Sequence, residues 1–337
     1  MISNVDIQAL PARILVAPLN WGLGHASRCI PLIQTLVDAG KKVHIGSDGE
    51  ALVFLKRAFP KLSFHALPSY DIEYKYASIE MSVLLQSTKM LSAIMQEKRS
   101  STQIIEDENI ELVISDNRYG VRSPHVKSII ITHQINLQSD NKLFSKSGTL
   151  INKRWIQKFD ECWVPDYPGS KLSGVMSEGG LNIPKKFIGP LTRIYKTDDV
   201  LDYDVLAIVS GPEPKRSQFS EKLINLLTNK VYKSVIVHGK VKDEIIRTDK
   251  GKLTQYNFLD SEKLNRVINQ SKIIICRSGF SSIMDLCDMN KKVILVPTEG
   301  QTEQVYLSEF LKGQYGFSTL NQNASEKDFE ELIKALL

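Results

Sequence analysis

The stretch Lys272–Met289, KIIICRSGFSSIMDLCDM, contains an apolar run, a glycine-containing turn and a helical pattern in direct succession. The run Lys272–Cys276 is apolar on successive residues, as expected of a strand that helices cover on both faces. Serine hydroxyls and free backbone N–H groups at the start of the helix Ile283–Met289 can hold a diphosphate without a metal. The stretch therefore predicts a parallel α/β sheet with a ligand site at the carboxyl end of a strand.

Similar Ile- and Val-rich runs alternate with segments of helical period along the rest of the chain. They fall into two series, separated by the weakly periodic stretch Gly179–Asp204. The predicted strands are Arg13–Pro18, Lys42–Ile45, Leu112–Ser115, Ser128–Thr132 and Glu161–Val164, then Val205–Val209, Ser234–Val237, Lys272–Cys276 and Val293–Val296. We expect two doubly wound domains, residues 1–190 and 205–323, with a linker at 191–204 and a final helix at 324–337.

The composition is that of an ordinary globular protein, with 42% hydrophobic and 24% charged residues among 337. No stretch approaches the roughly 18–20 apolar residues that span a bilayer, and the N-terminus lacks the features of a secretory signal, so we expect a cytoplasmic protein. The four cysteines form no C-x-x-C pair, which argues against a disulfide framework and a zinc site. The net charge of +5 suits an anionic ligand or a membrane surface, and no basic stripe with interleaved aromatics indicates nucleic acid.

The first turn of the chain joins a strand to a helical pattern through Gly22-Leu23-Gly24-His25. Gly22 and Gly24 permit tight backbone angles and the close approach of a ligand to a helix start. Ser27 stands where G-x-G-x-x-G requires a third glycine, which argues against a nicotinamide cofactor. His25 can accept a proton near neutral pH or bond to backbone at the helix start, and the spacing leaves both roles open.

Polar residues follow several other strand ends, where α/β folds place ligand contacts. Asp285, one turn inside the helix after Lys272–Cys276, lies within reach of a ribose diol or else complements the helix dipole. The loop after the last predicted strand offers Glu299, Gln301 and Gln304, which suit sugar hydroxyls or form a solvated helix cap.

In the first half, Asp116 and Arg118 follow one strand and His133 follows the next. These side chains are candidates to orient an acceptor hydroxyl, and stabilising their own loops is the alternative role. Asp202-Tyr203-Asp204 matches an Asp-x-Asp metal pattern, but it lies in the linker just before a strand, so we expect no metal there.

Three motifs stand along the chain in the order of a known family: Gly22–His25, then Cys276–Gly279 with Asp285, then Val296-Pro297 followed by Gln304. Weaker echoes are Gly189–Arg193, Ser210-Gly211 and Phe258–Asp260. With these segments spread over nearly its whole length, the chain resembles GT-B glycosyltransferases of the family 28 type. That group includes the UDP-N-acetylglucosamine transferase of lipid-linked peptidoglycan precursor synthesis.

The resemblance implies two Rossmann-like domains facing a central cleft, the first for the acceptor and the second for a nucleotide sugar, with the final helix packing back toward the first. It implies that His25 is the general base, that Asp285 binds the donor ribose and that Gln304 meets the donor sugar. The residues expected around the donor are Arg193, Gly211, Phe258, Leu259, Arg277, Ser278, Gly279, Phe280, Ser281, Asp285, Glu299, Gln301 and Gln304. The chain departs from the family at Pro212, where a small hydroxyl residue is usual, and in having a single glutamine at Gln304 instead of a pair.

The implied reaction moves a sugar from a nucleoside-diphosphate sugar, such as UDP-N-acetylglucosamine, to a hydroxyl of a glycan or lipid-linked acceptor of the cell envelope. It inverts the anomeric centre and needs no metal or other cofactor. Nucleotide-sugar hydrolases of the pseudaminic-acid pathway share the first turn and a nearby Arg-Cys, here Arg28-Cys29, so hydrolysis is the alternative activity. A non-catalytic nucleotide-sugar-binding protein is the third hypothesis.

Two segments, Met81–Arg99 and Lys142–Lys158, mix large apolar residues with Lys and Arg. Basic amphipathic helices can lie at an anionic membrane surface. A domain helix with a solvated basic face has the same composition. For a lipid-linked acceptor, these segments are where we expect peripheral membrane contact.

Overall fold

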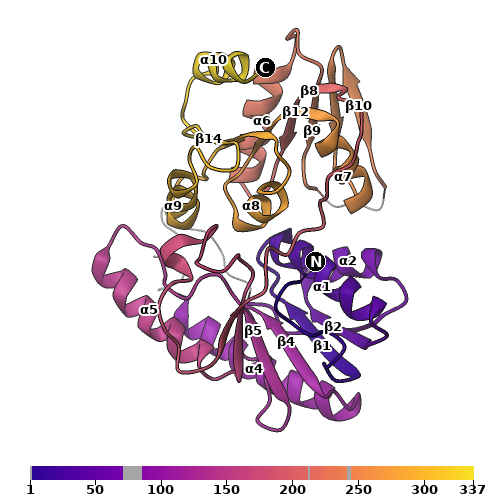
Figure 1. Cartoon of the computed structure of the whole chain (residues 1–337), viewed down its shortest axis with the longest axis vertical. Helices are drawn as coiled ribbons and strands as arrows, with labels where there is room; N and C mark the ends of the chain where they lie inside the picture. Colours follow the sequence, from indigo (N-terminus) through magenta and orange to yellow (C-terminus); the bar gives the residue numbers. More distant parts are fainter. Residues whose placement is uncertain (1, 71–85, 212, 241–243) are drawn as a thin grey trace. The chain divides into compact units, whose positions relative to one another are not determined.

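The computed structural model describes residues 2–70, 86–211, 213–240 and 244–337, so Pro212 lies outside the described residues. The chain forms two compact units, Met1–Leu191 and Thr192–Leu337. Each unit contains one seven-stranded sheet with helices packed on it (Figure 1). The predicted α/β class, with two parallel-sheet domains, is therefore confirmed.

The sheet of the first unit has the strand order β3-β2-β1-β4-β5-β6-β7, with parallel neighbours throughout. Its strands are β1 (Arg13–Pro18), β2 (Lys42–Ser47), β3 (Ser63–Ala66), β4 (Leu112–Asp116), β5 (Lys127–Ile131), β6 (Glu161–Val164) and β7 (Lys185–Phe187). Its described helices are α1 (Leu23–Asp38), α2 (Gly49–Ala58), α4 (Ser87–Asp107) and α5 (Lys142–Ile156). Because the order reverses between β1 and β4, the carboxyl ends of these two strands form a switch point at which α/β folds bind ligands.

The central strand β1 is apolar on successive residues because both of its faces are covered. Ile14, Leu15 and Val16 have no exposed surface, and Leu15 shares a cluster with Ile105 of α4 and Val113 of β4. Burying each such aliphatic side chain stabilises the fold by about 1.5–3 kcal/mol. This packing fixes the ends of β1 and β4, and with them the residues that follow.

The sheet of the second unit has the order β10-β11-β9-β8-β12-β13-β14, and only the β10–β11 pair is antiparallel among its described neighbours. Its strands are β8 (Tyr203–Ile208), β9 (Ser234–Val237), β10 (Arg247–Lys250), β11 (Leu253–Tyr256), β12 (Ser271–Cys276), β13 (Lys292–Leu295) and β14 (Phe317–Thr319). Its helices are α6 (Lys215–Leu227), α7 (Ser261–Asn269), α8 (Phe280–Leu286), α9 (Thr302–Phe310) and α10 (Glu326–Leu336). Here the switch point lies between β8 and β12.

The last helix, α10, begins with a capping box formed by Ser325 and Asp328. Its apolar residues Phe329 and Ile333 are buried in the core of the second unit, together with Phe219 of α6. The expectation that the final helix also packs back toward the first domain stays a prediction. The apolar side of α10 is buried within the second unit, because the face of the sheet beside α6 is apolar as well.

The segment predicted as the linker, 191–204, is hydrogen-bonded to α7 of the second unit. The N–H of Tyr195 donates to Asn265 Oδ1 at 2.8 Å, and the N–H of Thr197 donates to Asn269 Oδ1 at 3.1 Å. Two asparagine side chains thus satisfy backbone groups of residues 192–202, which form no helix or strand.

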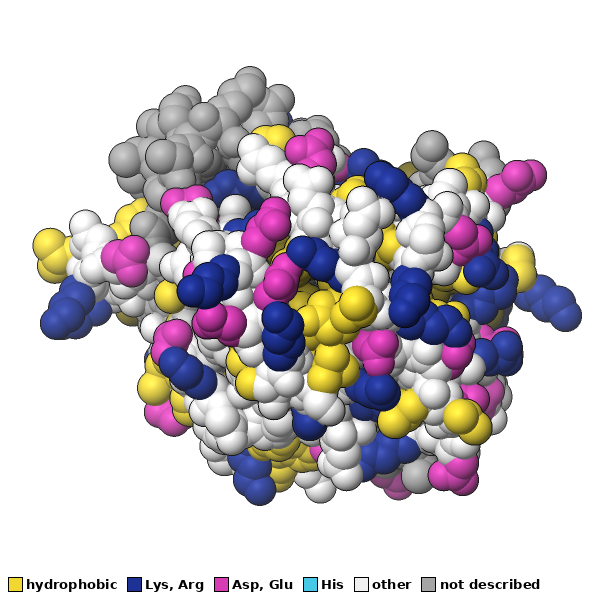
Figure 2. Space-filling model, turned by 90° about the horizontal axis from the view of Figure 1, so that it is seen from above, with side chains coloured by type: hydrophobic (Ala, Val, Ile, Leu, Met, Phe, Trp, Pro, Cys, Tyr) yellow, Lys and Arg dark blue, Asp and Glu magenta, His cyan; other side chains and the backbone are white. Residues whose placement is uncertain are grey.

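The helices in the described parts of the chain include none that is both long and apolar enough to cross a membrane. On the face that Figure 2 displays, Lys and Arg side chains are interspersed with Asp and Glu.

Candidate active site

His25 and Asp116 meet at the switch point of the first unit. His25 lies in the first turn of α1, directly after β1, and Asp116 is the last residue of the neighbouring strand β4. His25 Nδ1 is 3.1 Å from Asp116 Oδ1. His25 and Asp116 are separate predictions from the sequence, and the fold brings them together as a pair.

Arg28 binds the same carboxylate from one turn further along α1. Its Nε donates to Asp116 Oδ2 at 2.6 Å, and its Nη2 donates to Asp116 Oδ1. Arg28 and Asp116 are both buried. Such a two-point contact between a guanidinium and a carboxylate is strong and fixes the orientation of both groups.

The charge of Asp116 is set by these neighbours. Burial by itself would raise the pKa of Asp116, but the positive charge of Arg28, aided by His25, holds this pKa well below its usual range. Asp116 is therefore an anion at neutral pH. Cys29 Sγ also points at Asp116 Oδ2, at 3.4 Å, and burial followed by this negative charge raises the pKa of the thiol. Cys29 thus stays protonated and is no nucleophile.

The position of the proton on His25 decides what the ring can do. Its Nδ1 lies 3.1 Å from Asp116 Oδ1 and 2.9 Å from Arg28 Nη2. Because a guanidinium only donates, Nδ1 either donates to Asp116 or accepts from Arg28. In the first case Nε2 carries the lone pair and can accept a proton; in the second case Nε2 carries the hydrogen.

His133, after β5, joins this group from the other side of Arg28. The ring is buried, and its Nδ1 is 3.4 Å from Arg28 Nη1. His25, Asp116 and His133, three residues proposed from sequence, are thus linked through Arg28. Arg28 was predicted only as part of the Arg28-Cys29 motif, although its spacing of three residues from His25 places both on one face of a helix.

Arg118 has a different environment from the one expected of an acceptor contact. It is fully buried, and its guanidinium donates to Glu97 Oε1 at 2.7 Å, to Asp48 Oδ1 at 2.6 Å and to the carbonyl of Pro68 at 2.5 Å. Tyr70 Oη donates to the other oxygen of Glu97 at 2.7 Å. Of the two roles left open for Arg118, the geometry supports the stabilisation of loops: it ties together segments that follow β2, β3 and β4.

The glycine-rich turn leaves open space at the start of α1. Gly22 precedes the helix with φ +70, a value that favours glycine, and no atom of the described residues other than its chain neighbours lies within 4 Å of a Cβ built there. Ser27, at the position of the missing third glycine, donates its hydroxyl to the carbonyl of Gly24 at 3.0 Å. The turn is thus closed by a side chain where a dinucleotide-binding motif has glycine.

In the second unit, the glycines proposed for the diphosphate lie at the switch point. Gly211 follows β8 with φ +107, and Gly279 precedes α8, which begins at Phe280. Among the described residues other than its chain neighbours, no atom lies within 4 Å of a Cβ built at either glycine, so these residues leave the backbone accessible to a ligand at both. The ring of Phe280 is buried, which leaves only its backbone to face a ligand, while Ser281 is partly exposed.

Arg277 and Ser278, between β12 and α8, are buried. Ser278 Oγ donates to the carbonyl of Gln304 at 2.8 Å, so this hydroxyl stabilises the position of α9. The guanidinium of Arg277 lies 3.8 Å from the ring centroid of Phe219 and donates through Nη1 to two carbonyls at 3.2 Å each. Its Nε and Nη2 have no hydrogen-bond partner among the described residues. Burial lowers the pKa of Arg277 to about 10, which still leaves it charged at neutral pH.

Asp285 and Arg193 lie together where the chain enters the second unit. Asp285 Oδ1 accepts from Thr192 Oγ1 at 2.8 Å, and Arg193 Nη1 donates to Ser261 Oγ at 3.1 Å. Burial raises the pKa of Asp285, and the charge of Arg193 counteracts this rise. Thr192, which was not proposed from sequence, is the residue that orients Asp285.

Ser261 begins α7 directly after the predicted base-binding segment. In that segment Leu259 is buried, Phe258 precedes it, and Asp260 caps α7 by accepting from the N–H of Lys263 at 2.8 Å. A buried apolar side chain followed by a helix cap fixes the backbone of the segment. Such a fixed backbone is what recognition of a base through main-chain groups requires.

Gln304, proposed to meet the donor sugar, uses its side chain within the protein. Its Oε1 accepts from the N–H of Thr298 at 2.9 Å, and its Nε2 donates to Gln301 Oε1. Both side chains therefore shape the loop between β13 and α9. Glu299, in the same loop, is exposed.

The chain is similar to glycosyltransferases in three comparisons with known proteins. Residues 213–337 match the family model described as the glycosyltransferase family 28 C-terminal domain. A curated relative from Methanosarcina acetivorans, described as an uncharacterized glycosyltransferase, is 23% identical over 317 residues, which cover 87% of this chain and 81% of the relative. A second, from Methanosarcina mazei, is 21% identical over 315 residues with the same coverage.

Two solved structures share the fold over nearly the whole chain. The calicheamicin glycosyltransferase CalG4 has a TM-score of 0.66 at 13% identity, covering 97% of this chain and 90% of CalG4. The spinosyn rhamnosyltransferase SpnG, complexed with thymidine diphosphate, has a TM-score of 0.63 at 12% identity, covering 96% and 91%. At these identities the likeness is one of architecture.

Proposed function

We propose that the chain is a GT-B glycosyltransferase of the family 28 type, as its similarities support, and that it transfers a sugar from a UDP-sugar, such as UDP-N-acetylglucosamine, to a hydroxyl acceptor. The observation that carries the proposed mechanism is the His25–Asp116 pair at the switch point of the first unit. A histidine oriented by a buried carboxylate is the arrangement that general-base catalysis uses.

In the proposed reaction, an oxygen of the acceptor attacks the anomeric carbon of the donor while the bond from that carbon to the diphosphate breaks. The acceptor proton passes to Nε2 of His25, and the nucleoside diphosphate leaves with the bonding electrons. A single displacement of this kind inverts the anomeric centre. Asp116 holds Nδ1–H and stabilises the imidazolium as it forms.

Arg28 has two opposing effects in this scheme. It keeps Asp116 ionised, and it also offers an N–H to the nitrogen of His25 that faces Asp116. When Arg28 donates to that nitrogen, the ring proton is on Nε2 and the ring cannot act as base. We propose that a bound acceptor hydroxyl, by donating to Nε2, selects the catalytic tautomer.

For the donor, we propose that the backbone at Gly211 and Gly279 accommodates the diphosphate. Arg193 and Arg277 would supply the positive charge that stabilises the leaving group without a metal, and Asp285 would accept from a ribose hydroxyl. The open space beside both glycines and the unsatisfied donors of Arg277 support this assignment. The complex of SpnG with thymidine diphosphate supports a nucleoside diphosphate as the class of ligand.

Hydrolysis of a nucleotide sugar is the second candidate function. Arg28 and Cys29, the pair shared with nucleotide-sugar hydrolases, both contact Asp116. The same base would then take its proton from a water molecule. Only the attacking molecule distinguishes the two reactions, so product analysis separates them.

The test is a thermal-shift panel of nucleotide sugars, each with and without magnesium, followed by product analysis on the best ligand. The proposal expects stabilisation by one UDP-sugar, independent of magnesium, with almost no free sugar released in the absence of an acceptor. Rapid release of free sugar would favour the hydrolase. Failure of every nucleotide sugar to stabilise the protein would contradict the donor site.

For the acceptor, we propose a lipid-linked or glycan substrate presented at an anionic membrane surface. Leu91 and Met95 of α4 and Leu143, Leu150 and Ile151 of α5 are exposed. The two helices are neighbours, because side chains of both share one apolar cluster. Basic residues accompany the exposed apolar ones: Lys89, Lys98, Lys142, Lys146, Lys153 and Arg154. Residues 81–85 of the predicted amphipathic segment lie outside the described part of the chain.

This membrane contact is tested by cosedimentation with vesicles of phosphatidylglycerol and phosphatidylcholine, and of phosphatidylcholine alone. The double variant Leu150→Glu/Ile151→Glu should lose most of the binding to the anionic vesicles. The matched control is Val200→Glu/Leu201→Glu, which adds the same two charges at two adjacent exposed apolar residues of the second unit. Equal binding by both variants would refute the contact.

A further inference from the structure

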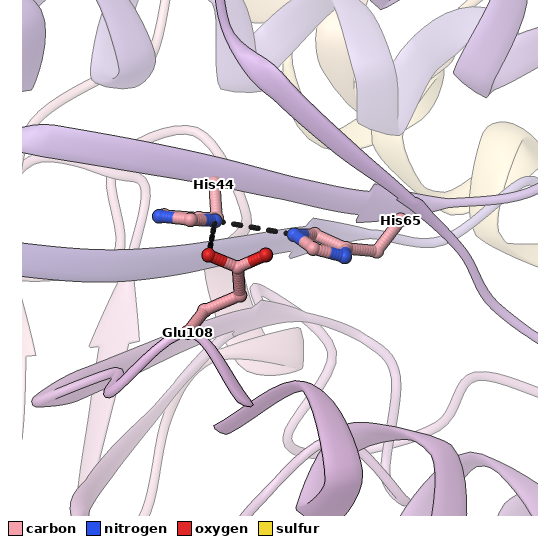
Figure 3. Close-up of side chains that lie close together, drawn as sticks. All are labelled: His44, His65 and Glu108. Atoms are coloured by element: carbon pink, nitrogen blue, oxygen red, sulfur yellow. Dashed lines mark hydrogen bonds and ion pairs between the residues drawn. The ribbon is translucent and has the colours of Figure 1, made fainter. Parts of the chain in front are cut away.

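A second cluster of ionisable side chains lies in the first unit, away from the switch point. His44 on β2, His65 on β3 and Glu108, just after α4, bring one ligand atom each within 4.8 Å of one another (Figure 3). His44 is near the amino end of β2, and Glu108 precedes the start of β4. His65 is the third of the four residues of β3, so the cluster lies at the β3–β2 edge of the sheet, whereas the candidate active site follows the carboxyl ends of β1 and β4.

The register of the sheet explains why the two histidines meet. His65 pairs with Gly46 of β2, and side chains two apart on a strand share a face, so His44 and His65 lie diagonally on one face. Gly46 places no side chain beside them. The two rings are stacked, with their centroids 5.4 Å apart and an angle of 19° between their planes. Glu108 reaches the same place from the end of α4.

The distances match those in a coordination sphere. His44 Nδ1 is 3.1 Å from His65 Nε2 and 3.8 Å from Glu108 Oε2. Two ligand atoms of a tetrahedral zinc ion, each bonded at about 2.0–2.1 Å, are about 3.3 Å apart. In Figure 3, dashed lines join the same nitrogen of His44 to both His65 and Glu108, so small side-chain rotations would complete three sides of such a sphere.

The chemistry of the three groups also suits a metal. Two imidazole nitrogens and one carboxylate form a His₂Glu set, which zinc uses with a fourth position left for water. His44 has no exposed surface, and its Nε2 has no hydrogen-bond partner in the described part of the chain, so Nδ1 carries all its described polar contacts.

We propose that His44, His65 and Glu108 form a binding site for a divalent transition-metal ion of the zinc type. His65 and Glu108 are partly exposed, so the ion can enter from solvent and keep a water molecule in the fourth position. The bound ion cross-links β2, β3 and the end of α4. The cysteine pattern gave no sign of this site because it uses no thiolate, and the three residues are far apart in sequence.

The test is calorimetric titration of Zn²⁺ into the full-length chain, freed of any affinity tag and of metal. The wild type should bind one equivalent, and Zn²⁺ at about 100 times the Kd should raise the Tm by about 5–10 °C. His65→Ala should weaken binding by more than about 100-fold, and Glu108→Gln by about tenfold or more. Both side chains are partly exposed, so both variants should keep the wild-type Tm in EDTA.

The matched control is His125→Ala, which removes an exposed histidine outside the cluster and should leave the Zn²⁺ affinity and the Tm shift unchanged. Absence of a one-equivalent isotherm in the wild type would overturn the proposal. So would Zn²⁺ binding by His65→Ala and Glu108→Gln with wild-type affinity. Neither readout depends on transfer activity, so the result is independent of the proposed function.

Discussion

Replacing Asp116 by asparagine tests the assignment of the base most sharply. At 3.1 Å, the attraction between the Asp116 carboxylate and the imidazolium of His25 amounts to about 5 kcal/mol at an effective dielectric constant of about 20. Arg28 compensates part of that charge, and the amide can also hold the wrong tautomer of the ring. We therefore expect kcat to fall by about 10²–10⁴, or about 2.7–5.5 kcal/mol.

The assay is turnover of the nucleotide sugar identified by thermal shift, measured at saturation, with the donor Kd determined separately by calorimetry. Arg28 loses its buried counter-charge in this variant, so the free energy of unfolding should fall by about 3–5 kcal/mol, and turnover is compared at a temperature where both proteins are folded. The control is Asp38→Asn, an exposed aspartate at the end of the same helix. A folded Asp116→Asn variant with kcat within about twofold of wild type would refute the reasoning.

Three further outcomes are expected. Arg118→Met leaves two buried carboxylates without their cation and should lower the free energy of unfolding, measured in urea, by about 3–5 kcal/mol. The control Arg247→Met replaces an exposed arginine and should change the free energy of unfolding by less than about 0.5 kcal/mol. The folded-state pKa of Asp116 lies below its unfolded value of about 3.9, so its stabilising contribution is present above that pH and lost as the pH falls through the folded pKa. Urea unfolding of wild type and Asp116→Asn should accordingly show a difference that shrinks below about pH 4. Gly279→Val fills the open space before α8, and Gly279 has no positive φ that would strain the valine. The donor Kd should rise by at least about tenfold, or 1.4 kcal/mol, with little change in Tm. Unchanged donor affinity in calorimetry would remove Gly279 from the donor site.

The central strands could be predicted from the sequence because burial on both faces requires unbroken apolar runs. Ile273, Ile274 and Ile275 in β12 are fully buried, as their succession indicates. The edge strands gave no such signal. β10, with the sequence RTDK, is exposed along its length, and the pairing that makes it a strand comes from its antiparallel partner β11.

The site was partly predictable for a related reason. Strand ends indicate where ligands bind, so His25 and Asp116 were both candidates, but they are 91 positions apart and only the parallel pairing of β1 with β4 makes them a pair. The burial of Arg118 could not be read from its place after β4. Its carboxylate partners, Asp48 and Glu97, come from other segments of the chain, and no local pattern connects them.

The most direct measurement of the central claim is made on His25→Ala, with donor affinity by calorimetry and turnover of the same nucleotide sugar in parallel. If His25 is the general base of sugar transfer, the donor Kd should stay within about twofold of wild type while turnover falls by about 10²–10⁴. Near-full turnover by a variant that still binds the donor would contradict the account.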